Sequence, residues 1–306
     1  MPLLSVRNLH VTFAVPGGAI EAVRGVSFDL DRGETLAVVG ESGSGKSVTA
    51  LSILQLLPYP MASHARGSSI VFQSQELVGA PEPVMRDIRG NRIAMVFQEP
   101  MTSLNPLHTI EKQLSETLYL HKRMDARAAR ARILELLHLV GLRDAEQRLD
   151  AYPHQLSGGQ RQRVMIAMAL ANEPDILIAD EPTTALDVTI QAQILKLLKE
   201  LQARFGMALM LITHDLGIVR KMADRVLVMT KGEVVEAGPV AQPVDEVEDL
   251  GLHRDVERRR GLVGDEKCGI AGERHGDHDA LALPAGKLVR IAVEARLRFR
   301  NPDLRQ

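Results

Sequence analysis

Residues 40–47 read GESGSGKS and fit the phosphate-loop pattern GxxxxGK[ST]. The apolar residues 35–39 before them predict a strand, and residues 47–57 have the apolar pattern of a helix. Glycine allows backbone dihedral angles that turn successive N–H groups toward phosphate oxygens, and the helix N-terminus adds its positive end. The segment therefore predicts a nucleotide site formed by Gly40, Glu41, Ser42, Gly43, Ser44, Gly45, Lys46 and Ser47. Within it, Lys46 is expected to bind the β and γ phosphates, and the Ser47 hydroxyl to bind Mg²⁺.

Residues 176–181, ILIADE, form an apolar run that ends in two carboxylates. A strand here would bring Asp180 to the carboxyl edge of a sheet, where open α/β sheets bind ligands. We expect Asp180 to hold Mg²⁺ through water, and Glu181 to act as the catalytic base on the water that attacks the γ phosphate. The simpler alternative is a pair of solvated acidic residues that open a loop.

The run LSGGQ, residues 156–160, precedes an apolar segment without helix breakers and so opens a predicted helix. A helix N-terminus of this kind can bind an anion. Because the chain already has one phosphate cradle, a second anion site indicates a partner chain. The residues concerned are Ser157, Gly158, Gly159 and Gln160.

Strand-like and helical runs alternate along the chain, which predicts an α/β fold with a mainly parallel sheet. The alternating apolar residues of 4–14 and 20–30 predict two strands joined by a turn, the beginning of an antiparallel β subdomain. A helical block of about 98–172 is expected to form an inserted helical subdomain within one domain, residues 3–240. Further strands are predicted at 92–97, 175–180, 207–213 and 224–229, and helices at 189–204 and 215–222.

The composition is that of an ordinary globular protein, with 45% hydrophobic and 25% charged residues. The net charge of −2 lacks the strong positive charge that is typical of nucleic-acid-binding proteins. No apolar run reaches 18 residues and no secretion signal opens the sequence. The single cysteine, Cys268, excludes disulfides within the chain and metal sites built from several cysteines. We expect a cytosolic location and any membrane role to be peripheral.

The order of the three motifs resembles the ATP-binding cassette family over roughly residues 3–238, which implies a cassette ATPase that uses ATP and Mg²⁺. The resemblance adds four site residues. Gln98 matches a glutamine that senses Mg²⁺, and His214 a catalytic switch histidine at the γ phosphate. Phe13 matches the aromatic residue that stacks on adenine, and Asp187 lies in a loop that crosses between two cassettes. The alternatives are a surface glutamine, a structural histidine and a core phenylalanine.

Longer stretches resemble the ATPases of di- and oligopeptide importers, and most of all the first cassette of the tandem Yej type associated with peptide and microcin C uptake. Residues 97–106, FQEPMTSLNP, lie where a transporter's coupling helix would dock. This resemblance implies a peripheral enzyme at the cytoplasmic face of the inner membrane that couples ATP hydrolysis to peptide transport. Its partners would be a second cassette, identical or paralogous, two membrane permease subunits and, indirectly, a periplasmic peptide-binding protein, with no nucleic acid.

Two other functions are compatible with a cassette. Soluble cassette ATPases act in translation or DNA repair, but they often carry zinc cysteines, a specific tandem linker or inserted coiled coils, which are not found here. A degenerate or truncated cassette would bind nucleotide without turnover. The presence of Lys46, Asp180, Glu181 and His214 argues against degeneracy.

Residues 241–306 differ in character from the rest of the chain. They contain one aromatic residue, Phe299, and no sustained helical or strand period before about residue 287. The resemblance stops just after Gly238, and no second phosphate loop follows. We expect this tail to be mobile or loosely packed, because it has few large apolar side chains to bury. Truncation or a reading-frame change in a longer tandem protein would produce it; a lineage-specific regulatory tail is the alternative.

Overall fold

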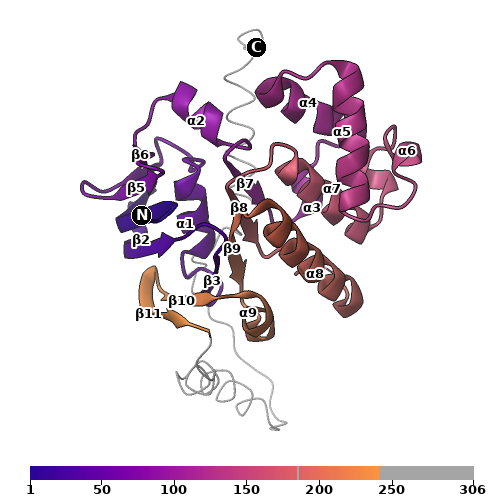
Figure 1. Ribbon diagram of the computed structural model, residues 1–306. Coiled ribbons are helices and arrows are strands. Elements are labelled where there is room, and N and C mark those ends of the chain that lie inside the picture. Colours follow the sequence, from indigo (N-terminus) through magenta and orange to yellow (C-terminus); the bar gives the residue numbers. More distant parts are fainter. Residues whose placement is uncertain (185, 241–306) are drawn as a thin grey trace, which may run out of the picture.

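The computed structural model describes residues 1–184 and 186–240, and within them it has two sheets, with most of the helices gathered on one side (Figure 1). The larger sheet has the strand order β11-β10-β3-β9-β8-β7. All its neighbouring strands are parallel except β10 and β11. Its strands are β3 (Thr35–Val39), β7 (Ile93–Val96), β8 (Ile176–Asp180), β9 (Ala208–Thr213), β10 (Arg225–Thr230) and β11 (Glu233–Pro239). Every residue of β3, β8 and β9 is buried, as expected for parallel strands covered on both faces.

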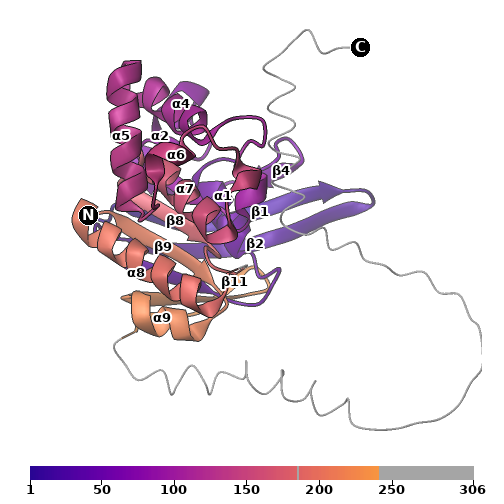
Figure 2. The ribbon, with the colours of Figure 1, turned by 90° about the vertical axis from the view of Figure 1, so that its right-hand side faces the viewer.

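The smaller sheet is antiparallel, with the order β2-β1-β5-β6 and β4 paired to β1. Its strands are β1 (Leu4–Val15), β2 (Gly18–Leu30), β4 (Ala62–His64), β5 (Ser69–Phe72) and β6 (Gln75–Glu76). Figure 2 shows the β1–β2 hairpin projecting as a long arm. The turn at Pro16–Gly17 joins its strands, as the sequence predicts.

Helices occupy the connections between strands. They are α1 (Lys46–Ile53), α2 (Glu82–Ile88), α3 (Pro100–Ser103), α4 (Ile110–Lys122), α5 (Ala126–Leu139), α6 (Ala145–Arg148), α7 (Gly158–Leu170), α8 (Val188–Phe205) and α9 (Leu216–Met222), with a 3₁₀ helix at Pro153–Gln155. Helices α3 to α7 all lie between β7 and β8 in the chain and gather on one side of the larger sheet (Figure 1). No helix of the described residues is long and apolar enough to cross a membrane.

The two larger of three buried clusters among the described residues hold these layers together. One joins the apolar face of α5, including Ile133 and Leu137, to α7, α8 and one face of the larger sheet. The other joins the antiparallel sheet and α1 to the opposite face, where Ile178 and Met210 are fully buried. The larger sheet is thus the layer that connects the two halves of the core.

The predicted fold class is confirmed: a mainly parallel sheet with an antiparallel β sheet and inserted helices. The helix predicted at 47–57 is shorter, however, and ends at Ile53. Gln55 has a φ of 51°, and the N–H groups of Gln55 and Leu56 return to the carbonyls of Ser52 and Leu51. This is a Schellman motif with glutamine in the position usually taken by glycine. The expectation for the tail, residues 241–306, lies outside the described residues.

Candidate nucleotide-binding site

The phosphate loop leaves the end of β3 and runs directly into α1, as predicted. Gly45 caps the helix with a φ of 98°, in the left-handed region that favours glycine. Glu41, Ser42 and Gly43 are exposed, whereas Ser44 and the helix start are buried. The loop therefore presents its exposed tip at the positive end of α1.

Lys46 bends back over the loop. Its Nζ donates to the carbonyl oxygens of Gly40 and Glu41, both at 2.8 Å, and lies 3.4 Å from the Ser44 hydroxyl. Burial lowers the pKa of Lys46, and the negative charges of Glu181 and Asp180 act in the opposite direction. Among the described residues, the hydrogen-bond partners of the buried ammonium are thus polar and uncharged, and a phosphate can replace them with a stronger, charge-assisted interaction.

Asp180 ends β8 and is only 7% exposed. Burial raises the pKa of its carboxyl to about 6, a hydrogen bond from Ser47 opposes this, and the charge of Glu181 reinforces it. Its Oδ1 is buried without a hydrogen-bond partner. A buried carboxylate oxygen without a partner, beside a hydroxyl, fits a hard cation such as Mg²⁺. No cluster of three acidic, histidine or cysteine residues that could hold a metal occurs in the described part of the chain. The donor set therefore suits Mg²⁺ that keeps waters and phosphate oxygens as its other ligands.

Glu181 follows β8 with a φ of 46°, and its N–H donates to the carbonyl of Ile212 at 2.9 Å. Its Oε2 accepts from Nε2 of Gln98 at 3.0 Å and from the Thr184 hydroxyl at 2.9 Å. Its Oε1 lies 3.3 Å from Nδ1 of His214. The three predicted residues Gln98, Glu181 and His214 thus meet beyond the carboxyl ends of the adjacent strands β7, β8 and β9.

Thr184 was not predicted as a site residue. Its contact depends on the turn after Glu181, in which the Thr184 N–H also donates to the Glu181 carbonyl at 3.3 Å. A hydroxyl residue three positions after the carboxylate was the only signal in the sequence. That spacing is too common to be recognised on its own.

Residues 157–160 begin α7 through a capping box. The Ser157 hydroxyl accepts from the N–H of Gln160 at 3.4 Å, and the Gln160 side chain accepts from the N–H of Ser157 at 2.9 Å. Asp187 caps α8 in a similar way, accepting from the N–H of Ile190 at 2.9 Å. The two helix starts are neighbours, since a Cβ added at Gly159 would lie 3.0 Å from Ile190. No hydrogen bond or ion pair among the described residues joins 157–160 to the phosphate loop.

Phe13 lies on β1, opposite Ile20 of β2 and Ala62 of β4. Its side chain is half-buried and packs against the cluster that contains the antiparallel sheet. It thus takes part in the core, as the alternative reading held. Part of the Phe13 ring is exposed, so stacking on adenine remains possible in geometry and stays a prediction.

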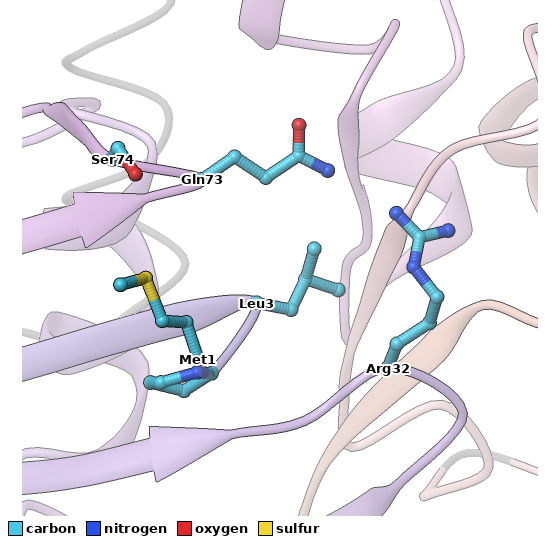
Figure 3. Close-up of a pocket in the computed structure, with 6 residues that line it drawn as sticks. Met1, Leu3, Arg32, Gln73 and Ser74 are labelled. Atoms are coloured by element: carbon cyan, nitrogen blue, oxygen red, sulfur yellow. The ribbon is translucent and has the colours of Figure 1, made fainter.

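A separate open pocket of about 310 Å³ lies at the start of the chain, lined by Met1, Pro2, Leu3, Arg32, Gln73 and Ser74 (Figure 3). It contains none of the predicted site residues. Arg32 is also paired to Asp175 at 2.8 Å. The pocket is therefore distinct from the nucleotide site.

Comparisons with known proteins agree with this geometry. Residues 23–184 match the family described as ABC transporter. The chain is 65% identical over 241 residues to the peptidoglycan transport ATP-binding protein YejF of Agrobacterium fabrum, an alignment that covers 79% of this chain and 44% of that protein. It is 57% identical to the dipeptide transport ATP-binding protein DppD of Bacillus subtilis, covering 77% of this chain and 70% of that one.

Solved structures give the same result. A dimeric structure of the cassette MJ0796, in a post-hydrolysis state with ADP and Pi, superposes with a TM-score of 0.69 at 31% identity, covering 78% of this chain and 98% of that one. The chain therefore belongs to the ABC transporter family and has the fold of its ATP-binding cassette, as predicted. It spans less than half of the YejF protein.

Proposed function

We propose that this chain is the subunit of an inner-membrane ABC importer that binds and hydrolyses ATP, and that the importer carries peptides. The observation that carries the proposal is the meeting of Gln98, Glu181 and His214 near the two buried side chains of Lys46 and Asp180. Separate strands of the parallel sheet bring these groups to one edge. A protein that only binds nucleotide needs the phosphate loop, but it does not need a carboxylate aligned by a glutamine and a histidine.

Each side chain has a role that its chemistry allows. Lys46 and the N–H groups of residues 40–47 hold the phosphates of ATP. Ser47, Asp180 and Gln98 would hold Mg²⁺, and the ion would neutralise phosphate charge. Glu181 accepts the proton of the attacking water, and His214 contacts the γ phosphate and orients Glu181.

A second cassette completes the site. Residues 157–160 form a helix N-terminus at which Ser157 is exposed, and such an end binds anions. Among the described residues, no hydrogen bond or ion pair joins it to the chain's own phosphate loop. In a pair of cassettes it would reach the phosphates held by the partner, with Asp187 at the boundary. The dimeric form of the MJ0796 cassette supports this arrangement.

The transported substrate is inferred from relatives. Proteins named for dipeptide, oligopeptide and peptidoglycan transport are 54–65% identical to this chain over most of its described length. The compounds in these three names all contain peptide bonds, so we infer a peptide substrate. The chain would therefore sit at the cytoplasmic face of the inner membrane, held there by two permease subunits.

The test has two stages. The purified full chain should release phosphate from ATP in the presence of Mg²⁺, and Lys46→Ala should abolish this by weakening ATP binding. Reconstituted in vesicles with the permease subunits of a peptide importer, the chain should show ATP hydrolysis that increases with a peptide and its binding protein. Absence of Mg²⁺-dependent hydrolysis under both conditions would overturn the proposal.

A further inference from the structure

The turn between β10 and β11 packs against the phosphate loop, although it comes from the far end of the described chain. Thr230 and Glu233 pair across the turn, and its two central residues, Lys231 and Gly232, have φ values of 50° and 87°. Positive φ at both central residues defines a type I′ turn, which suits a tight hairpin. The turn therefore has a defined backbone conformation, which can fix the position of the phosphate loop that it contacts.

Gly232 links the phosphate loop to β2 through its own backbone. Its N–H donates to the carbonyl of Ser44 at 3.1 Å, and its carbonyl accepts from the N–H of Arg24 at 2.8 Å. Both hydrogen bonds involve main-chain groups only. One residue thus ties the loop to a strand of the antiparallel sheet.

The bond to Ser44 sets the direction of a neighbouring donor. In a planar trans peptide the C=O and the following N–H point in opposite directions. Because the Ser44 carbonyl faces Gly232, the N–H of Gly45 in the same peptide unit faces away from the turn. In phosphate loops such N–H groups cradle the phosphates. Gly232 therefore holds one donor of the cradle in its orientation.

There is no room for a side chain at this junction. A Cβ added at Gly232 would lie 2.8 Å from the carbonyl oxygen of Ala22, and one added at Gly45 would lie 2.7 Å from the same oxygen. The Cβ at Gly45 would also be 3.5 Å from Cα of Gly232. Similarly, one at Gly40 would be 2.1 Å from the carbonyl oxygen of Met229, the last residue but one of β10. The loop is thus enclosed by the backbones of β2 and the β10–β11 hairpin.

We propose that Gly232 is a positioning residue for nucleotide binding, acting through the Ser44 carbonyl to keep the Gly45 N–H available to phosphate. The inference rests on the proposed function, because it requires a nucleotide in the loop. The proposal adds the β10–β11 turn to the nucleotide site. This turn belongs neither to the sequence motifs nor to the carboxyl ends of the strands that form the rest of the site.

Gly232→Ala tests the proposal, with Gly33→Ala as the matched control. Both glycines have positive φ, 87° and 74°, so both substitutions strain the backbone, but a Cβ at Gly33 meets nothing within 4 Å. Displacing the turn from Ser44 removes about one hydrogen bond, so ATP and ADP should bind roughly 2- to 12-fold more weakly to Gly232→Ala. Gly33→Ala should keep the ATP and ADP affinity of the unsubstituted chain.

Adenosine separates positioning from general loosening. It has no phosphate, so its affinity, measured by competition against a fluorescent adenine nucleotide, should be the same in all three proteins. If Gly232→Ala binds ATP as tightly as Gly33→Ala, or if it loses adenosine affinity equally, the proposal is wrong. An unsubstituted chain that binds no ATP would overturn both the proposed function and this inference. ATP binding that is lost in Lys46→Ala but kept in Gly232→Ala would overturn the inference alone.

A measurement on the unsubstituted full chain does not depend on how the variant folds. Coupling is reciprocal, so a turn that favours nucleotide binding must itself be stabilised by bound nucleotide. Amide hydrogen exchange at Gly232 should slow on addition of ADP, by more than at Gly206, whose N–H caps the distant end of α8. Equal effects at the two amides would contradict the proposal.

Discussion

Gln98 and Glu181 are joined by a hydrogen bond of 3.0 Å from Nε2 to Oε2, across 83 residues of sequence. This hydrogen bond constrains the orientation of the Glu181 carboxylate. The Thr184 hydroxyl shares the same oxygen, and His214 lies at the other. The attacking water would have to compete with these three partners for the carboxylate oxygens. The same partners keep the carboxylate at the ends of β7, β8 and β9.

Replacing Glu181 with glutamine should separate binding from turnover. The amide cannot accept the proton of the attacking water, so hydrolysis should fall by about 10²- to 10⁴-fold. ATP affinity should stay near that of the unsubstituted chain, because Lys46 and the loop are unchanged. Phosphate release and equilibrium ATP binding are the two measurements. Glu200→Gln, an exposed change on α8, is the control and should leave both unaltered. Full hydrolysis by Glu181→Gln would show that another group is the base.

Asp180→Asn should stabilise the nucleotide-free protein while abolishing Mg²⁺-dependent hydrolysis. Burial raises the pKa of Asp180 from 3.8 to about 6, so the folded state binds the proton more tightly than the unfolded state does. This contribution to stability is fully present below about pH 4 and is lost as pH rises through about 6.

At pH 8 the carboxylate is charged and buried, and a neutral amide should raise the free energy of unfolding by about 1–3 kcal/mol. At pH 4 the two proteins should differ little. Urea unfolding at both pH values measures this, without nucleotide. A variant less stable than the unsubstituted chain at pH 8 would contradict the burial argument.

Ser157→Arg should block the pairing of two cassettes. A large cation at the exposed N-terminus of α7 removes the hydroxyl cap and places bulk and positive charge where the partner's phosphates would lie. In a Glu181→Gln background, which retains ATP, light scattering should show ATP-induced dimers that disappear with Ser157→Arg. Gln147→Arg makes the same change of charge at an exposed position on α6 and should leave dimers intact. Unaltered dimerisation with Ser157→Arg would mean that α7 does not face the partner.

Glu76→Gln should destabilise the antiparallel sheet. The Glu76 Oε1 accepts from the N–H groups of Ile70, Leu77 and Val78 at 2.9–3.0 Å, and Oε2 accepts from the Ser69 hydroxyl. Burial acts to raise the pKa of Glu76, but these four hydrogen bonds outweigh it and lower the pKa below 4.5.

Since the folded-state pKa is depressed, this stabilisation is present above about pH 4.5 and is lost as pH falls through the lower folded value. We expect Glu76→Gln to cost about 1–2 kcal/mol at pH 7 and less at pH 3. Urea unfolding at the two pH values, with Glu200→Gln as the neutral comparison, measures it. An equal loss at both pH values would assign the effect to packing rather than to charge.

The local chemistry of this protein could be predicted from sequence alone. The GESGSGKS loop, the apolar strands beside it and the helix start at LSGGQ, residues 156–160, each depend on residues close together in the chain. Their periodicity and residue types therefore contain the necessary information. Predicted strand ends agree with the structure to within one residue at 35–39, 92–97 and 175–180. The end of α1 was predicted wrongly because a glutamine, rather than a glycine, adopts the left-handed conformation at residue 55.

Only the tertiary structure decided which of these groups act together. The hydrogen bond of Gln98 to Glu181 and the closure of the β10–β11 turn on Ser44 both join segments that are far apart in the sequence and that the fold brings together. The groups concerned meet only after strands far apart in the sequence, β7 with β8 and β3 with β10, have paired in the larger sheet, so the periodicity of neighbouring residues does not predict these contacts. Gly232 is the clearest case: in the sequence it is an ordinary turn glycine, and only its bond to Ser44 and the carbonyl of Ala22 beside it show why a side chain has no place there.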